Sequence, residues 1–396
     1  MTVFDRLVGQ DSVEAELTQA ATAARRGIRE AGSAMTHAWL FTGPPGSGRS
    51  IAALCFAAAL QCTGDEVGCG SCSACHTTLA GTHGDVRRII PDGLSIAVYQ
   101  VREMINIASR RPTTGRWQIV IVEDADRLSE SAANALLKMV EEPPERTVML
   151  LCAPTDDPED FSVTLRSRCR HVHLATPPVA AIAQVLIERD GLEPEKAQWA
   201  ASVSGGHVGR ARRLATDPEA RERRIQALKI ASAAQRPASA YAAAAETDKY
   251  AVADGQRVAA ELNQRELDEL MVSMGAGGTG KGAAAATRGI KGAIGELEKR
   301  QKSRETRTIR DTYDRALIDL AGLYRDALAA SFAAPTTPTH PDFAEEAQRL
   351  AQVPPEGLLK CLEAILDCRE ALATNVKPKF ALASLVATLG AATRLD

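Results

Sequence analysis

Four cysteines lie at a spacing that suits a bound metal ion. Cys62, Cys69, Cys72 and Cys75 lie in the segment CTGDEVGCGSCSAC, where two overlapping C-x₂-C pairs bring three sulfurs to one turn. Cys62 can complete a tetrahedral site of four thiolates with no open position, which is typical of structural Zn²⁺. The segment therefore favours a zinc knuckle; an iron–sulfur cluster and unrelated reduced thiols are the alternatives.

A glycine-rich segment contains most of a phosphate-binding loop. The pattern G-x-x-x-x-G-K-[ST] is nearly complete in GPPGSGRS, so the predicted nucleotide-binding residues are Gly43, Pro44, Pro45, Gly46, Ser47, Gly48, Arg49 and Ser50. In such a loop the backbone N–H groups surround phosphate oxygens at a helix N-terminus, and the hydroxyl holds Mg²⁺. Arg49 stands where the pattern has lysine; it keeps the charge, but its longer, forked side chain cannot simply take the place of lysine.

A second segment supplies the carboxylates that such a site needs. The strand-like run WQIVIVEDAD ends in Glu123 and Asp124, followed by Asp126. A working site has Asp for the metal and then Glu to orient the attacking water, whereas here the order is reversed. Misplacing a catalytic group by about 1 Å can cost ~100-fold in rate. We therefore expect ATP or ADP with Mg²⁺ to bind weakly and ATP hydrolysis by this chain to be weak or absent.

The pattern of apolar runs predicts the elements that position these residues. Strand-like runs alternate with helical patterns through residues 1–175, which indicates an α/β domain with a parallel sheet and the cysteine knuckle, residues 62–75, as an insertion. Two short helices follow as a small lid over residues 176–215. We expect residues 216–396 to form an all-α domain, interrupted by a flexible Gly/Ala-rich insertion at 274–295.

Composition excludes several classes of function. No apolar run of the 396 residues reaches the ~18 needed to span a membrane. The start MTVFDRLVGQ has no signal-peptide pattern, so we expect a cytoplasmic chain. A net charge of −3 gives no bulk attraction to nucleic acid. The run KRQKSRETRTIR has six basic residues and one acid, and we interpret it as a solvated helix face in preference to a phosphate-backbone contact.

Several motifs together resemble a known family. VGQDSVEAEL, GPPGSGRS, SAANALLKMVEEPP and TLRSRC occur here in the order seen in AAA+ clamp-loader subunits of the bacterial DNA polymerase III, and the chain is most similar to the delta-prime group. The resemblance implies an AAA+ domain, a helical lid and a C-terminal collar domain that oligomerises. It also implies a zinc module at the position of the cysteine knuckle.

The resemblance further implies roles for individual residues. In the family, a Ser-Arg-Cys motif sends its arginine into the ATP site of a neighbouring subunit, and here that residue is Arg168. Arg166 and Arg170 flank Arg168 and are the alternatives to it, or simply bind solvent. Thr155 lies near the family's first sensor position. The second sensor falls on Gly209 or Arg210 and is left unassigned.

The resemblance implies partners as well. They are the motor subunits and the delta subunit of a hetero-pentamer and, through that complex, the sliding clamp and primer–template DNA. Two other functions are alternatives to this one. The first is that the chain is a catalytically active motor subunit. The second is that it is a zinc-dependent nucleic-acid binder that uses the knuckle and the basic run.

Overall fold

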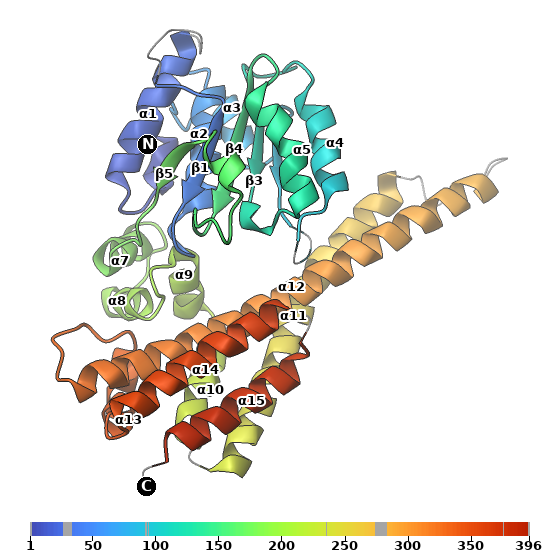
Figure 1. Ribbon diagram of the computed structural model, residues 1–396. Coiled ribbons are helices and arrows are strands. Elements are labelled where there is room, and N and C mark those ends of the chain that lie inside the picture. The colour runs from blue at the N-terminus through green and yellow to red at the C-terminus, as the bar shows by residue number, and fades with distance from the viewer. Residues whose placement is uncertain are drawn as a thin grey trace. The chain divides into compact units, whose positions relative to one another are not determined.

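The computed structural model describes residues 2–26, 34–91, 93, 95–234, 236–273, 283–374 and 376–394. The chain divides into two compact units (Figure 1). The first comprises Met1–Pro91 and Ser95–Ala215, and the second comprises Asp92–Leu94 and Thr216–Asp396. Each unit has its own hydrophobic core.

The first unit is built on a parallel sheet of five strands in the order β2-β3-β4-β1-β5. The strands are β1 (Ala38–Thr42), β2 (Val86–Ile89), β3 (Gln118–Val122), β4 (Thr147–Ala153) and β5 (Arg170–His173). Every residue of β1, β3 and β4 is buried, as expected for central strands covered on both faces. The predicted α/β class is confirmed, although the sequence patterns did not predict β5.

Helices cover both faces of this sheet (Figure 1). Because neighbouring residues of a strand point to opposite faces, Trp39 and Phe41 of β1 pack with one set of helices, while Ala38 and Leu40 pack with the other. The first set is α1 (Asp11–Arg26), α2 (Arg49–Gln61) and α3 (Ser73–Leu79), together with the 3₁₀ turn η1 (Val3–Arg6). The second is α4 (Val98–Ala108), α5 (Glu130–Glu141) and α6 (Val163–Arg166), and the 3₁₀ turn η2 (Ala125–Arg127) follows β3.

The same unit ends in a small helical cluster. It consists of α7 (Val179–Glu188), α8 (Pro194–Ser202) and α9 (Val208–Thr216), which share a core of small and aliphatic side chains. The sequence predicts two helices here, and the structure has three. Arg212 and Arg213 make α9 strongly charged, so its apolar face, carried by Ala211 and Ala215, is short and easily missed in the pattern.

The second unit is helical, as expected. Its helices are α10 (Pro218–Ala233), α11 (Pro237–Ser273), α12 (Ala283–Ser331), α13 (Ala344–Leu350), α14 (Pro355–Ala373) and α15 (Pro378–Ala392), with the 3₁₀ turn η3 (Pro341–Phe343) before α13. The helices α11 and α12 run side by side in opposite directions, because Asn263 lies beside Arg304 and Asp248 beside Tyr313.

Two expectations about this unit need correction. Residues 283–295 belong to α12, so the segment 274–295 is not a continuous flexible insertion; residues 274–282 lie outside the described residues. The basic run is not a plain solvated face either. Arg304 pairs with Glu266 of α11 at 2.7 Å and donates to Asn263 Oδ1, also at 2.7 Å.

Among the described residues, no helix is both long enough and apolar enough to cross a membrane.

Candidate nucleotide and metal sites

The glycine loop joins β1 to α2, and its geometry requires glycine at several positions, among them Gly43 and Gly48. Gly48 adopts φ 95° directly before the first turn of α2, a conformation that side chains disfavour. At Gly43, a Cβ atom would lie 2.3 Å from the carbonyl oxygen of Leu174. The first N–H groups of α2 have no partner within the helix and can bind an anion. Residues 43–48 therefore lead directly into the N-terminus of α2, which is the kind of position at which a phosphate loop binds its ligand.

Polar atoms around the loop are buried without a partner. Ser47 Oγ, Arg49 Nη1 and Asp126 Oδ1 have no hydrogen bond among the described residues. Burial raises the pKa of the Asp126 carboxyl and Asp124 raises it further, while the positive charges of Arg127 and Arg49 oppose the rise. Buried polar groups cost free energy unless they are bonded. Ser47 Oγ and Arg49 Nη1 can donate to a phosphate group, whereas Asp126 Oδ1 suits a cation or a donor. Asp126 is a residue that the sequence patterns did not assign to the site.

The two predicted acids lie at the end of β3 in different surroundings. Glu123 follows β3, and its Oε1 accepts a hydrogen bond of 3.0 Å from Arg88 Nε on the edge strand β2, so the two side chains form an ion pair. Asp124 adopts φ 49° and turns the chain into η2. The carboxylate of Glu123 is thus already neutralised by an arginine of the same chain. The sequence could not reveal Arg88, because it lies 35 residues away and belongs to a neighbouring strand.

The end of β4 approaches the loop at the predicted sensor position. The N–H of Gly43 donates to Pro154 O at 3.3 Å. Thr155 follows, and its Oγ1 accepts a hydrogen bond of 3.1 Å from the N–H of Asp157. The predicted sensor residue therefore lies next to the loop, with its hydroxyl engaged in a local turn.

Residues outside the sequence motifs also contact the loop. Gln10 Nε2 donates to Ser47 O at 3.3 Å and to Ala175 O at 2.6 Å, which ties the loop to the segment before α7. His207 is packed so closely on Gly46 that a Cβ there would lie 2.6 Å from the His207 Cβ. The N–H of Arg210 donates to His207 Nδ1, so His207 also caps α9. Gly209 and Arg210, the two candidates for the second sensor, lie in the first turn of this helix.

Arg168 lies just after α6, with its side chain exposed. Its Nη1 donates to Thr164 O at 2.9 Å, and its Nη2 pairs with Glu141 Oε1 of α5 at 2.7 Å. This pair is solvent-exposed on both sides, and exposed ion pairs typically contribute only about 0–1 kcal/mol. Apart from the hydrogen bond to Thr164 O, the guanidinium is therefore held by a weak surface contact.

The two flanking arginines differ in how firmly they are engaged. Arg170 pairs with Glu16 at 2.7 Å, donates to Ala34 O and lies over the ring of Trp39 at 5.0 Å. Arg166 pairs with Asp156 at 2.7 Å. Of the three arginines of the motif, Arg170 is thus committed to the fold.

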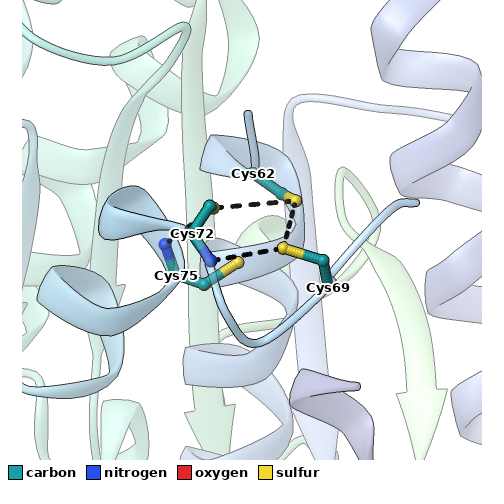
Figure 2. Close-up of side chains that lie close together, drawn as sticks. All are labelled: Cys62, Cys69, Cys72 and Cys75. Carbon is teal, nitrogen blue, oxygen red and sulfur yellow. Dashed lines mark hydrogen bonds between the residues drawn. The ribbon is translucent and has the colours of Figure 1, made fainter. Parts of the chain in front are cut away.

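The four cysteines converge on one point, as the spacing predicts (Figure 2). Cys62 Sγ lies 3.7 Å from Cys69 Sγ and 4.0 Å from Cys72 Sγ, and all four sulfurs lie within 4.8 Å of one another. Four sulfurs bound tetrahedrally at about 2.3 Å would be about 3.8 Å apart, whereas a disulfide needs about 2.05 Å. The arrangement fits a four-coordinate metal ion and no disulfide. Cys62 directly follows α2, and Cys72 is the N-cap of α3, so two helix ends hold the cluster.

Local hydrogen bonds favour thiolates in this cluster. Burial raises the pKa of the Cys72 thiol, but donors from Cys75 and Thr63 outweigh it and lower the pKa to about 5. The hydroxyl and N–H of Ser71, with the N–H of Cys72, lower the pKa of Cys69. Burial raises the pKa of Cys75. Because a metal binds the deprotonated sulfur, the surroundings of Cys69 and Cys72 favour the form that binds a metal.

Comparisons with known proteins match the first unit. Residues 26–178 match the family model for DNA polymerase III, delta subunit. DNA polymerase III subunit delta' of Bacillus subtilis is 32% identical over 197 residues, which are 50% of this chain and 59% of that protein. Subunit delta' of Pseudomonas aeruginosa is 35% identical over 183 residues, 45% of this chain and 55% of that protein. DNA polymerase III subunit gamma/tau of Mycobacterium tuberculosis is 30% identical over 209 residues, which are 51% of this chain and 34% of that protein.

The matched region spans little more than half the length of the delta' relatives. It contains the glycine loop, the cysteine cluster, the acids after β3 and Arg168. Residues 26–178 therefore carry the sequence signature of the DNA polymerase III delta family, and the resemblance to clamp-loader subunits of the delta-prime type that the motifs indicate is confirmed.

Proposed function

We propose that the chain is a delta-prime-type subunit of a clamp loader and helps to place a sliding clamp on primed DNA during replication. It joins motor subunits and a delta subunit in a hetero-pentamer and meets the clamp and the primer–template DNA through that complex. Residues 1–175 act as the AAA+ domain, residues 176–215 as its lid and residues 216–396 as the oligomerising collar.

The observation that carries this proposal is the ion pair between Glu123 and Arg88. The carboxylate that a motor subunit would use at its metal is bound to an arginine of the edge strand, and Arg49 replaces the loop lysine. Meanwhile Arg168 is exposed, and its contacts are a surface ion pair with Glu141 and local hydrogen bonds to Thr164 O and Ser167 Oγ. In this function the chain contributes its chemistry to a neighbour, because an arginine supplied in trans stabilises the charge that develops on the γ-phosphate.

The orphaned polar atoms support a second, compatible role for the loop. Ser47, Arg49 and Asp126 keep buried polar atoms that lack partners among the described residues. We propose that ATP or ADP with Mg²⁺ binds here without efficient turnover. Bound nucleotide then stabilises the first unit and shapes the surface that contacts a neighbouring subunit. The alternative function, that of a motor subunit, is less favoured.

The four-cysteine cluster holds a structural Zn²⁺ in this proposal. The ligands are Cys62, Cys69, Cys72 and Cys75, and a closed set of four sulfurs leaves no position for substrate or water. The ion would cross-link the end of α2 to the start of α3, and it has no part in hydrolysis.

The test is reconstitution with the motor and delta subunits of the same organism. With the native chain, we expect a single complex of defined mass by light scattering, and retention of the clamp on primed circular DNA. Loading that is equally efficient without the chain would contradict the proposed function. Vigorous ATP hydrolysis by the isolated chain would instead support the motor alternative.

A further inference from the structure

An arginine distant in sequence holds the loop that links two cysteines of the cluster. Arg25, near the end of α1, donates from Nη2 to Gly64 O at 2.9 Å and to Glu66 O at 3.2 Å. From Nη1 it donates to Asp65 O at 2.8 Å. Three consecutive carbonyl groups are thus bound by one guanidinium, whose planar fork of donors is suited to this task.

The segment held in this way lies directly against the sulfurs. A Cβ at Gly64 would be 2.8 Å from Cys69 Sγ and 3.8 Å from Cys62 Sγ. The carbonyl oxygen of Glu66 is 3.2 Å from Cys62 Sγ. A shift of residues 64–66 by a few tenths of an ångström would therefore change the positions of both sulfurs.

The charge of Arg25 also matches the cluster. Among the described residues, no carboxylate lies within salt-bridge distance of it, although its side chain is half-buried. Four thiolates around a divalent cation carry a net charge of about −2. A guanidinium bonded to the loop between two of these ligands offsets part of that charge in a partly desolvated place.

We propose that Arg25 is a positioning residue for the metal site, which it tunes through residues 64–66 without binding the ion. The inference rests on the metal site proposed above. Partners that orient the ligands of a metal typically change its affinity by about 10–100-fold when they are substituted.

The experiment measures Zn²⁺ affinity of the full chain by competition with a chromophoric chelator. The variants are Arg25→Met, which keeps the side chain's bulk, and Arg25→Lys, which keeps the charge but not the fork. The control is Arg87→Met, an exposed arginine of β2. We expect affinity to fall at least about tenfold for Arg25→Met, less for Arg25→Lys and not at all for Arg87→Met. With saturating Co²⁺, the thiolate-to-metal absorption per bound ion should be unchanged in every variant.

The outcomes separate this inference from the site itself. If the native chain binds no zinc, both the proposed metal site and the inference about Arg25 are refuted. If the native chain binds zinc and Arg25→Met binds it equally well within twofold, the role of Arg25 is refuted and the site stands. Should Arg25→Met fail to fold in saturating Zn²⁺, the affinity of Arg25→Lys decides, and a value equal to that of the native chain overturns the proposal.

Discussion

Asp85 is the most heavily hydrogen-bonded carboxylate among the described residues of the first unit. Its Oδ1 accepts from the N–H and hydroxyl of Thr113, at 2.8 and 2.9 Å. Its Oδ2 accepts from the N–H and hydroxyl of Thr114 and from the N–H of Gly115, at 2.7, 3.0 and 2.6 Å. This carboxylate fixes the turn that leads into β3, and hence into Glu123.

Substituting Asp85→Asn should destabilise the first unit by roughly 3 kcal/mol. The amide NH₂ would face the donors of Thr114 or Thr113, and buried donors without acceptors cost about 1–3 kcal/mol each. Urea unfolding followed by tryptophan emission measures this directly, because all three tryptophans lie in the first unit. An exposed control, Asp160→Asn, should change the free energy of unfolding by less than about 0.5 kcal/mol.

The same residue predicts a pH dependence. Burial raises the pKa of Asp85, but the N–H groups of Thr113, Gly115 and Thr114 outweigh it and lower the pKa below its usual value of about 3.9. Its stabilising contribution is therefore complete above about pH 4 and is lost as the pH falls through the folded-state pKa. The Asp85→Asn variant should show a shallower loss of stability in acid; an unchanged slope would contradict this account.

At the scale of elements, the sequence predicts the features whose residues lie close together along the chain. The four cysteines lie within one short segment, so their convergence follows from local spacing. The strands β1, β3 and β4 are largely apolar runs of the kind that a strand pattern reveals, whereas Arg170 and His171 interrupt the apolar pattern of β5. Two contacts that matter at the candidate sites join segments about 35–41 residues apart: Arg88 with Glu123, and Arg25 with residues 64–66. Contacts over such separations produce no local sequence pattern, so the sequence could not predict them.

The loop before α13 is fixed by a buried histidine of defined tautomer. Arg224 Nη2 donates to His340 Nδ1 at 2.8 Å, so the proton of His340 lies on Nε2, which donates to Asp319 O at 2.9 Å. Arg224 also binds both carboxylate oxygens of Asp342. The N–H of His340 donates to Asp326 Oδ2 at 2.8 Å. A protonated imidazole would place a second positive charge against Arg224.

This arrangement predicts acid sensitivity of the second unit. Burial and the charge of Arg224 lower the pKa of His340, and Asp319 and Asp326 only partly oppose this. The unfolded chain therefore takes up a proton below about pH 6.5 that the folded unit does not, and stability falls there by up to about 1.4 kcal/mol per pH unit. Hydrogen exchange of α10 and η3, corrected for intrinsic rates, should accelerate up to tenfold from pH 6.5 to 5.5. His340→Gln should remove most of this dependence, while His171→Gln in the first unit should not.

One glycine lies close against the partner helix in the pair of long helices. A Cβ at Gly255 of α11 would lie 2.3 Å from Ile309 Cγ1 and 3.3 Å from the Ile309 backbone nitrogen of α12. Gly255→Ala should destabilise the second unit, although alanine is about 1 kcal/mol better than glycine within a helix. Adding Ile309→Ala should restore part of the loss, with a coupling energy of about 1 kcal/mol in a double-mutant cycle measured by denaturant melts. Strictly additive effects would show that the helices do not depend on this contact.

At the scale of the whole molecule, the two units divide the proposed work. The first carries a loop suited to phosphate, an acid, Glu123, that already pairs with Arg88, and an exposed arginine, Arg168. The second is a helical assembly with its own core. In the proposed function, the contribution of the first unit depends on a neighbouring subunit whose ATP site Arg168 would enter.

The most direct test is primed-DNA-stimulated ATP hydrolysis by the reconstituted complex that contains native, Arg168→Ala or Arg168→Lys chain. Arg166→Ala is the matched control, since Arg166 lies two residues away in the same motif and pairs with Asp156. We predict that Arg168→Ala lowers turnover at least about tenfold with assembly intact, that Arg168→Lys recovers little, and that Arg166→Ala resembles the native chain. Native turnover with Arg168→Ala in a fully assembled complex would contradict the account.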